Sequence, residues 1–341
     1  MDGARAAGAR QGASWPRRRG DRRAVERKPT RRVKPRAVEV STRAGVVRGL
    51  VEADLQVFRG VPFAKPPVGA LRFRAPEPPD PWAGVRDAAG FAPASMQPAH
   101  AGPVAGMSRA PSSEDSLYLN VWAPRAPGPH PVFVWIHGGR EFVGGTDDPL
   151  YDGGALAARG IAVFTVAYRL GVFGFLALEH LLGDAYAGSG NNALLDQVAA
   201  LRWVRDEIAA FGGDPACVTV AGQSSGGLNV AALLAMDDAR GLFRAAVLES
   251  SFGGRPTYTP AEAEAVTDGV IEHLGITPSD AAQLHDATAT DLLEAQAAVL
   301  ARNPFPFRPV IDGTVLGRSG ATAVRDGLTR DVSILIGSNL N

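Results

Sequence analysis

Residues 218–236 read VTVAGQSSGGLNVAALLAM, and this stretch decides the fold. Residues 218–220 are apolar and β-branched, which predicts a short buried strand. Residues 228–236 are apolar except for Asn229 and contain no strong helix breaker, which predicts a helix. Between them lies a match to G-x-S-x-G, made by Gly222, Gln223, Ser224, Ser225 and Gly226. A strand, a tight turn and a helix form the context in which this pattern presents a nucleophile.

Ser224 is therefore the candidate nucleophile, and the residues around it have a physical reason. A serine on such a turn has a strained backbone, and the small residues Gly222 and Gly226 relieve crowding on either side. The helix that follows directs its unpaired N–H groups and positive dipole end at the charge that develops on a substrate. A glycine- and serine-rich turn without chemistry is the alternative, and the flanking strand and helix disfavour it.

A second candidate element follows the apolar run at residues 132–136, VFVWI. A continuous apolar run of this length is typical of a strand buried on both faces. His137, Gly138 and Gly139 come directly after it. Glycines there let the backbone approach a substrate and direct N–H groups at its carbonyl oxygen, which is an oxyanion hole. The alternative is a β-turn with an adjacent histidine, and the serine motif downstream favours the oxyanion hole.

The rest of the chain predicts an α/β fold with a mostly parallel central sheet and helices on both faces. Further buried strands are expected at residues 161–167, 245–248 and 334–337, and a helix at residues 193–211. Residues 46–58 predict a hairpin interrupted at Arg48-Gly49. Thr259 to Glu262 has capping-box spacing, and the helices of about residues 256–302 are expected to form a cap over the sheet.

Composition limits the classes of function. The 341-residue chain has no net charge, but residues 1–36 hold thirteen Arg or Lys against three acidic residues, which makes them net +10. Such a segment predicts a disordered basic tail, followed by one domain at residues 37–341. We find no glycine-rich phosphate loop, no His/Cys cluster and no long apolar run, so we expect no cofactor, metal, nucleic-acid partner or membrane span. Cys217 is the only cysteine, and we expect a cytoplasmic location.

Taken together, the motifs resemble the type-B carboxylesterase family of α/β-hydrolases, from about Val38 to the last residue. Residues 211–215 (FGGDP), which lead into the serine turn, match the nucleophile signature, and residues 114–121 (EDSLYLNV) match a second one. Supporting segments are residues 58–73, 168–176 and 191–203. The resemblance implies hydrolysis of carboxylic esters through an acyl-enzyme on Ser224. It implies an oxyanion hole formed by the backbone N–H groups of Gly139, Arg140 and Ser225.

The sequence also departs from the pattern of that family. Arg140 replaces a glycine, and Glu141 precedes Phe142 where the family phenylalanine follows directly. Gln223 replaces a glutamate beside the nucleophile. Ser116 replaces a cysteine that forms a disulfide in many relatives, and its expected partner near Ser95-Met96 is also missing. The loss of both cysteines is consistent with a reducing compartment.

The resemblance implies that a glutamate and a histidine from later in the chain complete a catalytic triad. The sequence stops at about the residue before that glutamate, so we expect a chain that lacks the last strand and the terminal helices. After Ser224 only His273 and His285 remain, and both lie in the predicted cap. We therefore keep two hypotheses: a serine carboxylesterase, or a catalytically inactive fragment or binding module on the esterase scaffold.

Overall fold

The computed structural model describes residues 36–99, 106–251 and 257–339. The chain divides into two units, Met1–Lys34 and Pro35–Asn341, and only the second contains described residues. The predicted basic tail lies outside the described residues except for Arg36, which begins the first strand. No helix in the described ranges is long and apolar enough to cross a bilayer. No group of three His, Cys, Asp or Glu residues within them could hold a metal ion.

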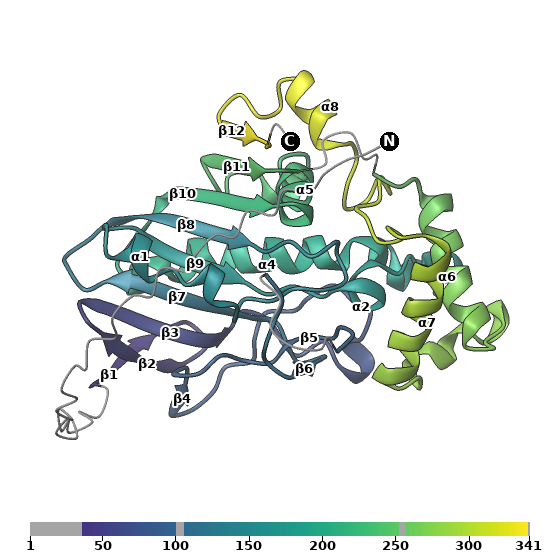
Figure 1. The fold of residues 1–341 in the computed structure, drawn as a ribbon, viewed down its shortest axis with the longest axis horizontal. Coiled ribbons are helices and arrows are strands. Elements are labelled where there is room, and N and C mark those ends of the chain that lie inside the picture. The colour runs from purple at the N-terminus through teal and green to yellow at the C-terminus, as the bar shows by residue number, and fades with distance from the viewer. Residues whose placement is uncertain (1–35, 100–105, 252–256, 340–341) are drawn as a thin grey trace, which may run out of the picture. The chain divides into compact units, whose positions relative to one another are not determined.

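Within the described residues, ten strands form one mixed sheet in the order β1-β2-β3-β7-β9-β8-β10-β11-β12, with β4 paired to β2 (Figure 1). Along this order, each strand from β1 to β9 is antiparallel to the next (β1-β2-β3-β7-β9). Each strand from β9 to β12 is parallel to the next (β9-β8-β10-β11-β12). The strands are β1 (Arg36–Ser41), β2 (Val46–Glu52), β3 (Leu55–Pro62), β4 (Val85–Asp87), β7 (Tyr118–Pro124), β8 (His130–Ile136), β9 (Ala162–Val166), β10 (Gly213–Gln223), β11 (Ala245–Glu249) and β12 (Ser333–Gly337).

The structure confirms the α/β fold, and the continuous apolar runs are the strands of its parallel half. The strand expected to be buried at residues 334–337 is present as β12, but all five of its residues are exposed, because β12 is the edge strand of the sheet. All five residues of β9 are buried, as expected for a strand covered on both faces. The predicted hairpin exists as β2 and β3, and Arg48-Gly49, which interrupts the apolar alternation, lies within β2. The turn lies between the strands at Ala53, whose φ is 51°. Gly49 is instead a strand residue that lets β3 approach closely, because a side chain there would overlap the carbonyl oxygen of Val57.

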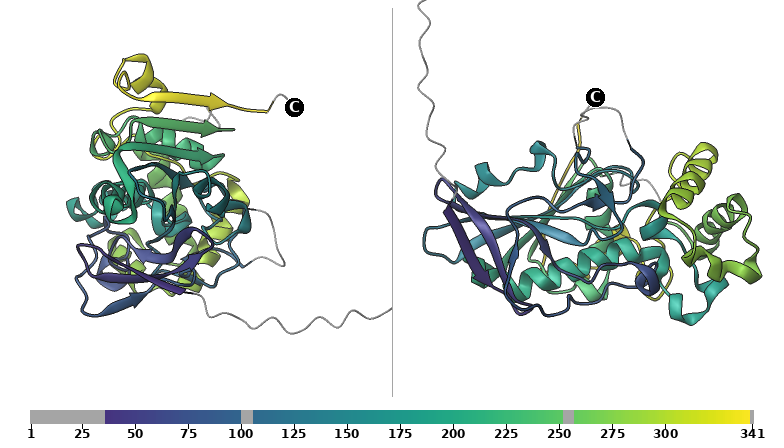
Figure 2. Two further views of the ribbon diagram at one scale, coloured as in Figure 1. Left: turned by 90° about the vertical axis from the view of Figure 1, so that its left-hand side faces the viewer. Right: turned by 90° about the horizontal axis from the view of Figure 1, so that it is seen from below.

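Helices cover both faces of the sheet, as expected from the sequence (Figure 2). On one face α4 contributes buried Leu194, Val198 and Leu201 to the main core, which also contains alternate residues of β8. On the other face α1 contributes Ala157 to a smaller core that contains Trp122. The helices are α1 (Gly154–Ala157), α2 (Gly171–Phe175), α3 (Glu179–Leu182), α4 (Asn192–Glu207), α5 (Ser225–Leu233), α6 (Pro260–His273), α7 (Ala289–Arg302) and α8 (Gly320–Arg325).

The predicted cap helices are α6, α7 and a 3-10 helix, Pro278–His285, between them; α6 and α7 lie together beside one end of the sheet (Figure 1). The capping box expected at Thr259 and Glu262 begins α6. The cap packs on the body through buried Gln296 of α7, whose side-chain oxygen accepts the backbone N–H of Val172 at 3.0 Å. Since α2 follows the C-terminal end of β9, this contact places α7 near that end of the sheet.

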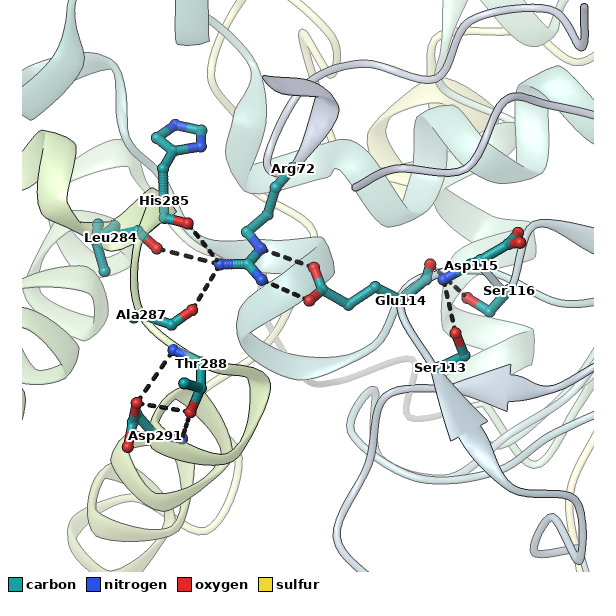
Figure 3. A network of polar contacts seen from close by, with 10 residues as sticks. All are labelled: Arg72, Ser113, Glu114, Asp115, Ser116, Leu284, His285, Ala287, Thr288 and Asp291. Carbon is teal, nitrogen blue, oxygen red and sulfur yellow. Dashed lines mark hydrogen bonds and ion pairs between the residues drawn. The ribbon is translucent and has the colours of Figure 1, made fainter. Parts of the chain in front are cut away.

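Arg72 forms a second attachment of the cap (Figure 3). Its guanidinium donates to both carboxylate oxygens of Glu114, at 2.7 and 2.5 Å. Its remaining nitrogen donates to the carbonyl oxygens of Leu284, His285 and Ala287, which belong to the cap. The Arg72 side chain is only 12% exposed. Water therefore replaces few of these hydrogen bonds if the guanidinium is removed.

We expect Arg72→Leu to destabilise the protein by about 2–3 kcal/mol, because it leaves a mostly buried carboxylate and three carbonyls unpaired. Urea unfolding measures the loss, and hydrogen exchange is expected to increase first at residues 284–291. Arg205→Ala is the matched control, because the Arg205 side chain is 49% exposed and pairs only with its neighbour Asp206. Equal stabilities of the two variants would contradict the role of Arg72.

Ser95 and Ser116 occupy the region where the resembled family carries a disulfide. Both are buried. The Ser95 hydroxyl donates to the Tyr168 carbonyl at 2.6 Å, and its oxygen lies at a hydrogen-bond distance of 3.0 Å from the Ser116 hydroxyl oxygen. The structure therefore brings the two positions into contact although neither is cysteine. A hydrogen-bonded pair of serines replaces the covalent link.

The double substitution Ser95→Cys and Ser116→Cys is expected to form a disulfide without moving the backbone. The positions are 21 residues apart in sequence, so the bond is expected to stabilise the protein by about 3 kcal/mol. Thermal unfolding with and without reductant measures this difference, and the single variant Ser116→Cys controls for loss of the hydroxyl pair. Free thiols that persist under oxidising conditions in addition to that of Cys217 would show that the two positions are too far apart or misaligned.

Candidate active site

The pairing of β8 with β10 brings the two candidate motifs together. These strands are parallel, and Gly222 of β10 is paired with Ile136 of β8. His137-Gly138 and Gln223-Ser224 are the next residues along each strand, so the two strands end side by side. A methyl group at Gly138 would lie 3.2 Å from Cβ of Ser224. The predicted oxyanion-hole segment, residues 137–141, is called the oxyanion corner below. This corner and the predicted nucleophile are therefore neighbours in space.

Ser224 has the strained backbone expected of a nucleophile on a sharp turn. Its φ is 57° and its ψ is −122°, between the end of β10 and the first residue of α5. Such a conformation costs about 1–3 kcal/mol and is maintained only by its surroundings. Two backbone hydrogen bonds hold it: the Ser224 N–H donates to Glu249 at 2.9 Å, and the Ser224 carbonyl accepts from Leu228 at 3.1 Å.

Gly226 is required by the close approach of α5 to the end of β8. A side chain there would overlap the carbonyl oxygen of Ile136 and approach that of His137 within 2.7 Å. Gly222 faces the same constraint, because a methyl group on it would overlap the backbone of Gly226. The two small residues of the motif thus let the helix N-terminus sit directly against the oxyanion corner.

The corner itself is a tight loop that leaves main-chain donors unused. The carbonyl of Gly139 accepts from the N–H groups of Phe142 and Val143, at 3.2 and 3.1 Å. The N–H groups of Gly139 and Arg140 donate to no acceptor in the described part of the chain. As the first residue of α5, Ser225 has no acceptor for its N–H within the helix. These three donors are the ones that the sequence predicts for an oxyanion hole.

Arg140 has a left-handed backbone conformation at the position where the resembled family has a glycine. Its φ is 58° and that of Glu141 is 68°, so two consecutive side chains occupy the left-handed region. Each such residue costs roughly 1–2 kcal/mol relative to a right-handed conformation. The Arg140 guanidinium lies 5.4 Å from the ring centroid of Phe305, on the segment that follows α7.

His137 is a packing residue of this corner. It is 1% exposed, its ring stacks on Tyr168 with centroids 4.5 Å apart, and its Nδ1 lies 2.8 Å from the Gly138 carbonyl. Burial lowers its pKa to about 4, so the imidazole is neutral at pH 7. The Tyr168 hydroxyl donates to the His137 carbonyl at 2.8 Å, which fixes the end of β8.

The remaining described histidines do not contact Ser224. His285 pairs with the Tyr186 hydroxyl at 2.8 Å, and His180 lies 3.3 Å from Asp268. His273 is at the last residue of α6, in a surface groove of the cap. Asp312 accepts three backbone N–H groups of a turn through one carboxylate oxygen. None of these side chains is placed to act as a base for Ser224.

Sequence reasoning missed a buried polar group behind the corner. Glu141 is 1% exposed, and its carboxyl accepts from the Asn229 side chain of α5 at 3.2 Å. Burial raises the pKa of Glu141 to about 8, opposed by the hydrogen bond from Asn229. The only available signal was the charged residue at a position where the resembled family has phenylalanine.

Comparisons with known proteins agree with this geometry. The sequence profile described as "Carboxylesterase family" matches residues 36–341. Para-nitrobenzyl esterase of Bacillus subtilis is 44% identical over 306 residues, which are 88% of this chain and 62% of that protein. Fumonisin B1 esterase of Sphingopyxis macrogoltabida is 41% identical over 306 residues, 87% of this chain and 55% of that protein.

The solved structures are equally similar. A Geobacillus stearothermophilus carboxylesterase superimposes with a TM-score of 0.81 at 46% identity, and covers 88% of this chain and 61% of its own. A structure titled PNB esterase gives 0.82 at 42% identity, over 89% of this chain and 63% of its own. The chain thus spans less than two thirds of the length of these relatives.

Proposed function

Because the chain belongs to the carboxylesterase family, we propose that it carries the acylating site of a serine carboxylesterase, with Ser224 as nucleophile. The Ser224 hydroxyl oxygen attacks the carbonyl carbon of a carboxylic ester. The resulting oxyanion accepts hydrogen bonds from the N–H groups of Gly139, Arg140 and Ser225. The intermediate then collapses, the alcohol leaves, and the acyl group remains on Ser224 until water hydrolyses it.

The observation that supports this proposal is the strained Ser224 beside three unused main-chain donors. Donors of this kind each contribute about 10²–10³-fold to the rate of acyl transfer, because they are already oriented before charge develops. A binding module has no use for the strain at Ser224, whereas a nucleophile needs to be presented on a sharp turn. The Ser224 side chain there is half-buried. The geometry therefore favours the esterase over a non-catalytic role.

The proton of the Ser224 hydroxyl must pass to a general base, and no histidine in the described ranges reaches it. The family resemblance assigns this role to a histidine that a glutamate orients, both C-terminal to Ser224. We expect this chain by itself to acylate slowly and to turn over little ester, because acylation and deacylation both need the base.

Capture of the acyl-enzyme tests the proposal. After incubation with p-nitrophenyl acetate and an acid quench, peptide mass spectrometry is expected to find one acetyl group, on Ser224. Acetylation confined to lysines or to other serines would contradict it, because those sites react without an oxyanion hole. The relatives named above hydrolyse different esters, so we propose carboxylic esters as the substrate class and no individual substrate.

A further inference from the structure

The corner and the nucleophile helix are joined by one pair of buried side chains. Glu141 comes from the corner, and Asn229 lies one helical turn after Ser225 on α5. The Asn229 amide donates to Oε2 of Glu141 at 3.2 Å. Oε1 of Glu141 and Oδ1 of Asn229 are both buried and have no hydrogen-bond partner among the described residues. Two acceptor oxygens are thus left over in the same pair.

An unpaired buried oxygen costs about 1–3 kcal/mol, and a buried carboxylate without a cation costs more. No Lys or Arg forms an ion pair with Glu141 in the described part of the chain. A single proton on Oε1 removes both difficulties, because a carboxylic acid and a carboxamide form a reciprocal pair. The acid O–H then donates to Asn229 Oδ1 while the Asn229 N–H donates to Oε2.

We propose that Glu141 is a positioning residue that holds a proton and pairs through both carboxyl oxygens with Asn229. This inference rests on the proposed function, because its purpose is to fix the distance between the two parts of the oxyanion hole. Gly139 and Arg140 come from the corner, and Ser225 comes from the helix. Among the described residues, the Glu141–Asn229 pair is the one side-chain hydrogen bond that joins the corner to α5.

The surroundings of the pair favour the neutral acid. Tyr168 faces it from the loop before α2, and burial raises the Tyr168 pKa well above its usual value, so this phenol is neutral. His137, stacked on Tyr168, is neutral at pH 7 because burial lowers its pKa to about 4. The Arg140 side chain lies over Phe305. The α5 side contributes Ser225 and Asn229, neither of which carries a charge.

The pair predicts how stability depends on pH. The pKa of Glu141 is raised from 4.5 in the unfolded chain to about 8 in the folded one. Between these values the folded protein holds a proton that the unfolded chain has lost. The stability contributed by this group therefore declines as pH rises from about 4.5 to about 8, and is level above that. Above about pH 8 the acid ionises in the folded state, and the pair loses one of its two hydrogen bonds.

Two variants of the full chain distinguish the effect of the proton on Glu141 from the effect of the shape of its side chain. Ionisation of Glu141 is expected to lower the wild-type acylation rate above about pH 8, because the pair then loses a hydrogen bond. Glu141→Gln supplies a permanent donor and acceptor, so it is expected to acylate like wild type at pH 7 and to lack this fall in rate above pH 8. Glu141→Leu fills the space without pairing, and its acylation rate is expected to fall by about 10², as for a misplaced donor. Neither variant is expected to show the pH slope of stability. Exposed Glu179→Gln is the control and is expected to retain it.

The readouts distinguish this inference from the esterase proposal. Urea unfolding between pH 5 and 9, and the infrared band of a protonated carboxyl that Glu141→Gln removes, need no activity. If these two signals appear but Ser224 is never acylated, the protonated Glu141–Asn229 pair is supported and the proposed esterase function is contradicted. If Ser224 is acylated but wild type and Glu141→Gln share the same pH slope of stability, the proton on Glu141 is disproved.

Discussion

Ser224→Ala is expected to reduce covalent labelling of the protein by a fluorophosphonate by at least about 10³-fold. The reagent phosphonylates a serine hydroxyl through a charged intermediate that the oxyanion hole stabilises. Removing one of three triad members leaves about 10³–10⁴-fold catalysis from the oxyanion hole and binding alone. Preferential labelling of Ser224 therefore does not require the general base. It requires only the strained turn and the donors beside it.

The labelling rate is measured by intact-protein mass spectrometry, and the site is found by peptide mapping. Ser112→Ala is the control, because Ser112 is exposed on a short strand outside the main sheet. This variant is expected to label at the wild-type rate. An adduct that persists in Ser224→Ala, or that forms on several serines at similar rates, would remove Ser224 from the mechanism.

Gly139→Ala is expected to have the second largest effect, because it distorts two of the three proposed donors. Gly139 has φ 130°, a conformation that side chains rarely adopt. An added methyl group would also overlap the carbonyl oxygen of Val143. The loop must therefore shift, and losing a single oriented donor costs about 10²–10³-fold in rate. Overpacking and strain are expected to destabilise the protein by roughly 2–4 kcal/mol as well.

Labelling and urea unfolding of the same preparation separate these two effects. Gly90→Ala is the matched control, since its φ is ordinary and a methyl group there meets no atom within 4 Å. It is expected to match wild type in both measurements. A Gly139→Ala protein that labels at the wild-type rate would show that the corner does not stabilise the oxyanion.

The serine turn could be predicted from the sequence because its parts are contiguous. A buried strand, five motif residues and a helix follow one another within residues 218–236. The parallel strands were also predictable from their continuous apolar runs, which are typical of strands buried on both faces. The burial of β12 was not, because this apolar strand lies at the edge of the sheet and is exposed. The antiparallel half of the sheet was harder to predict from the sequence. Its strand β7, Tyr118–Pro124, mixes polar and apolar residues although nearly all of them are buried. Its partners β3 and β9 are set by tertiary contacts.

The pair formed by Glu141 and Asn229 could not be predicted in this way. The two residues are 88 positions apart, and neither belongs to a motif. Their contact exists because the register of β8 and β10 brings the ends of those strands together. The position of the hairpin turn could not be predicted for a related reason. Gly49 serves the close approach of β3, whereas the actual turn uses Ala53 at φ 51°.

A crystal structure of the protein phosphonylated on Ser224 is the most direct measurement of the proposed site. The phosphonyl oxygen is expected to lie about 2.7–3.1 Å from the backbone nitrogens of Gly139, Arg140 and Ser225. Ser224 is expected to retain its positive φ. A phosphonyl oxygen that points to solvent, or that lies beyond hydrogen-bond reach of Gly139, would contradict the assignment of this corner as the oxyanion hole.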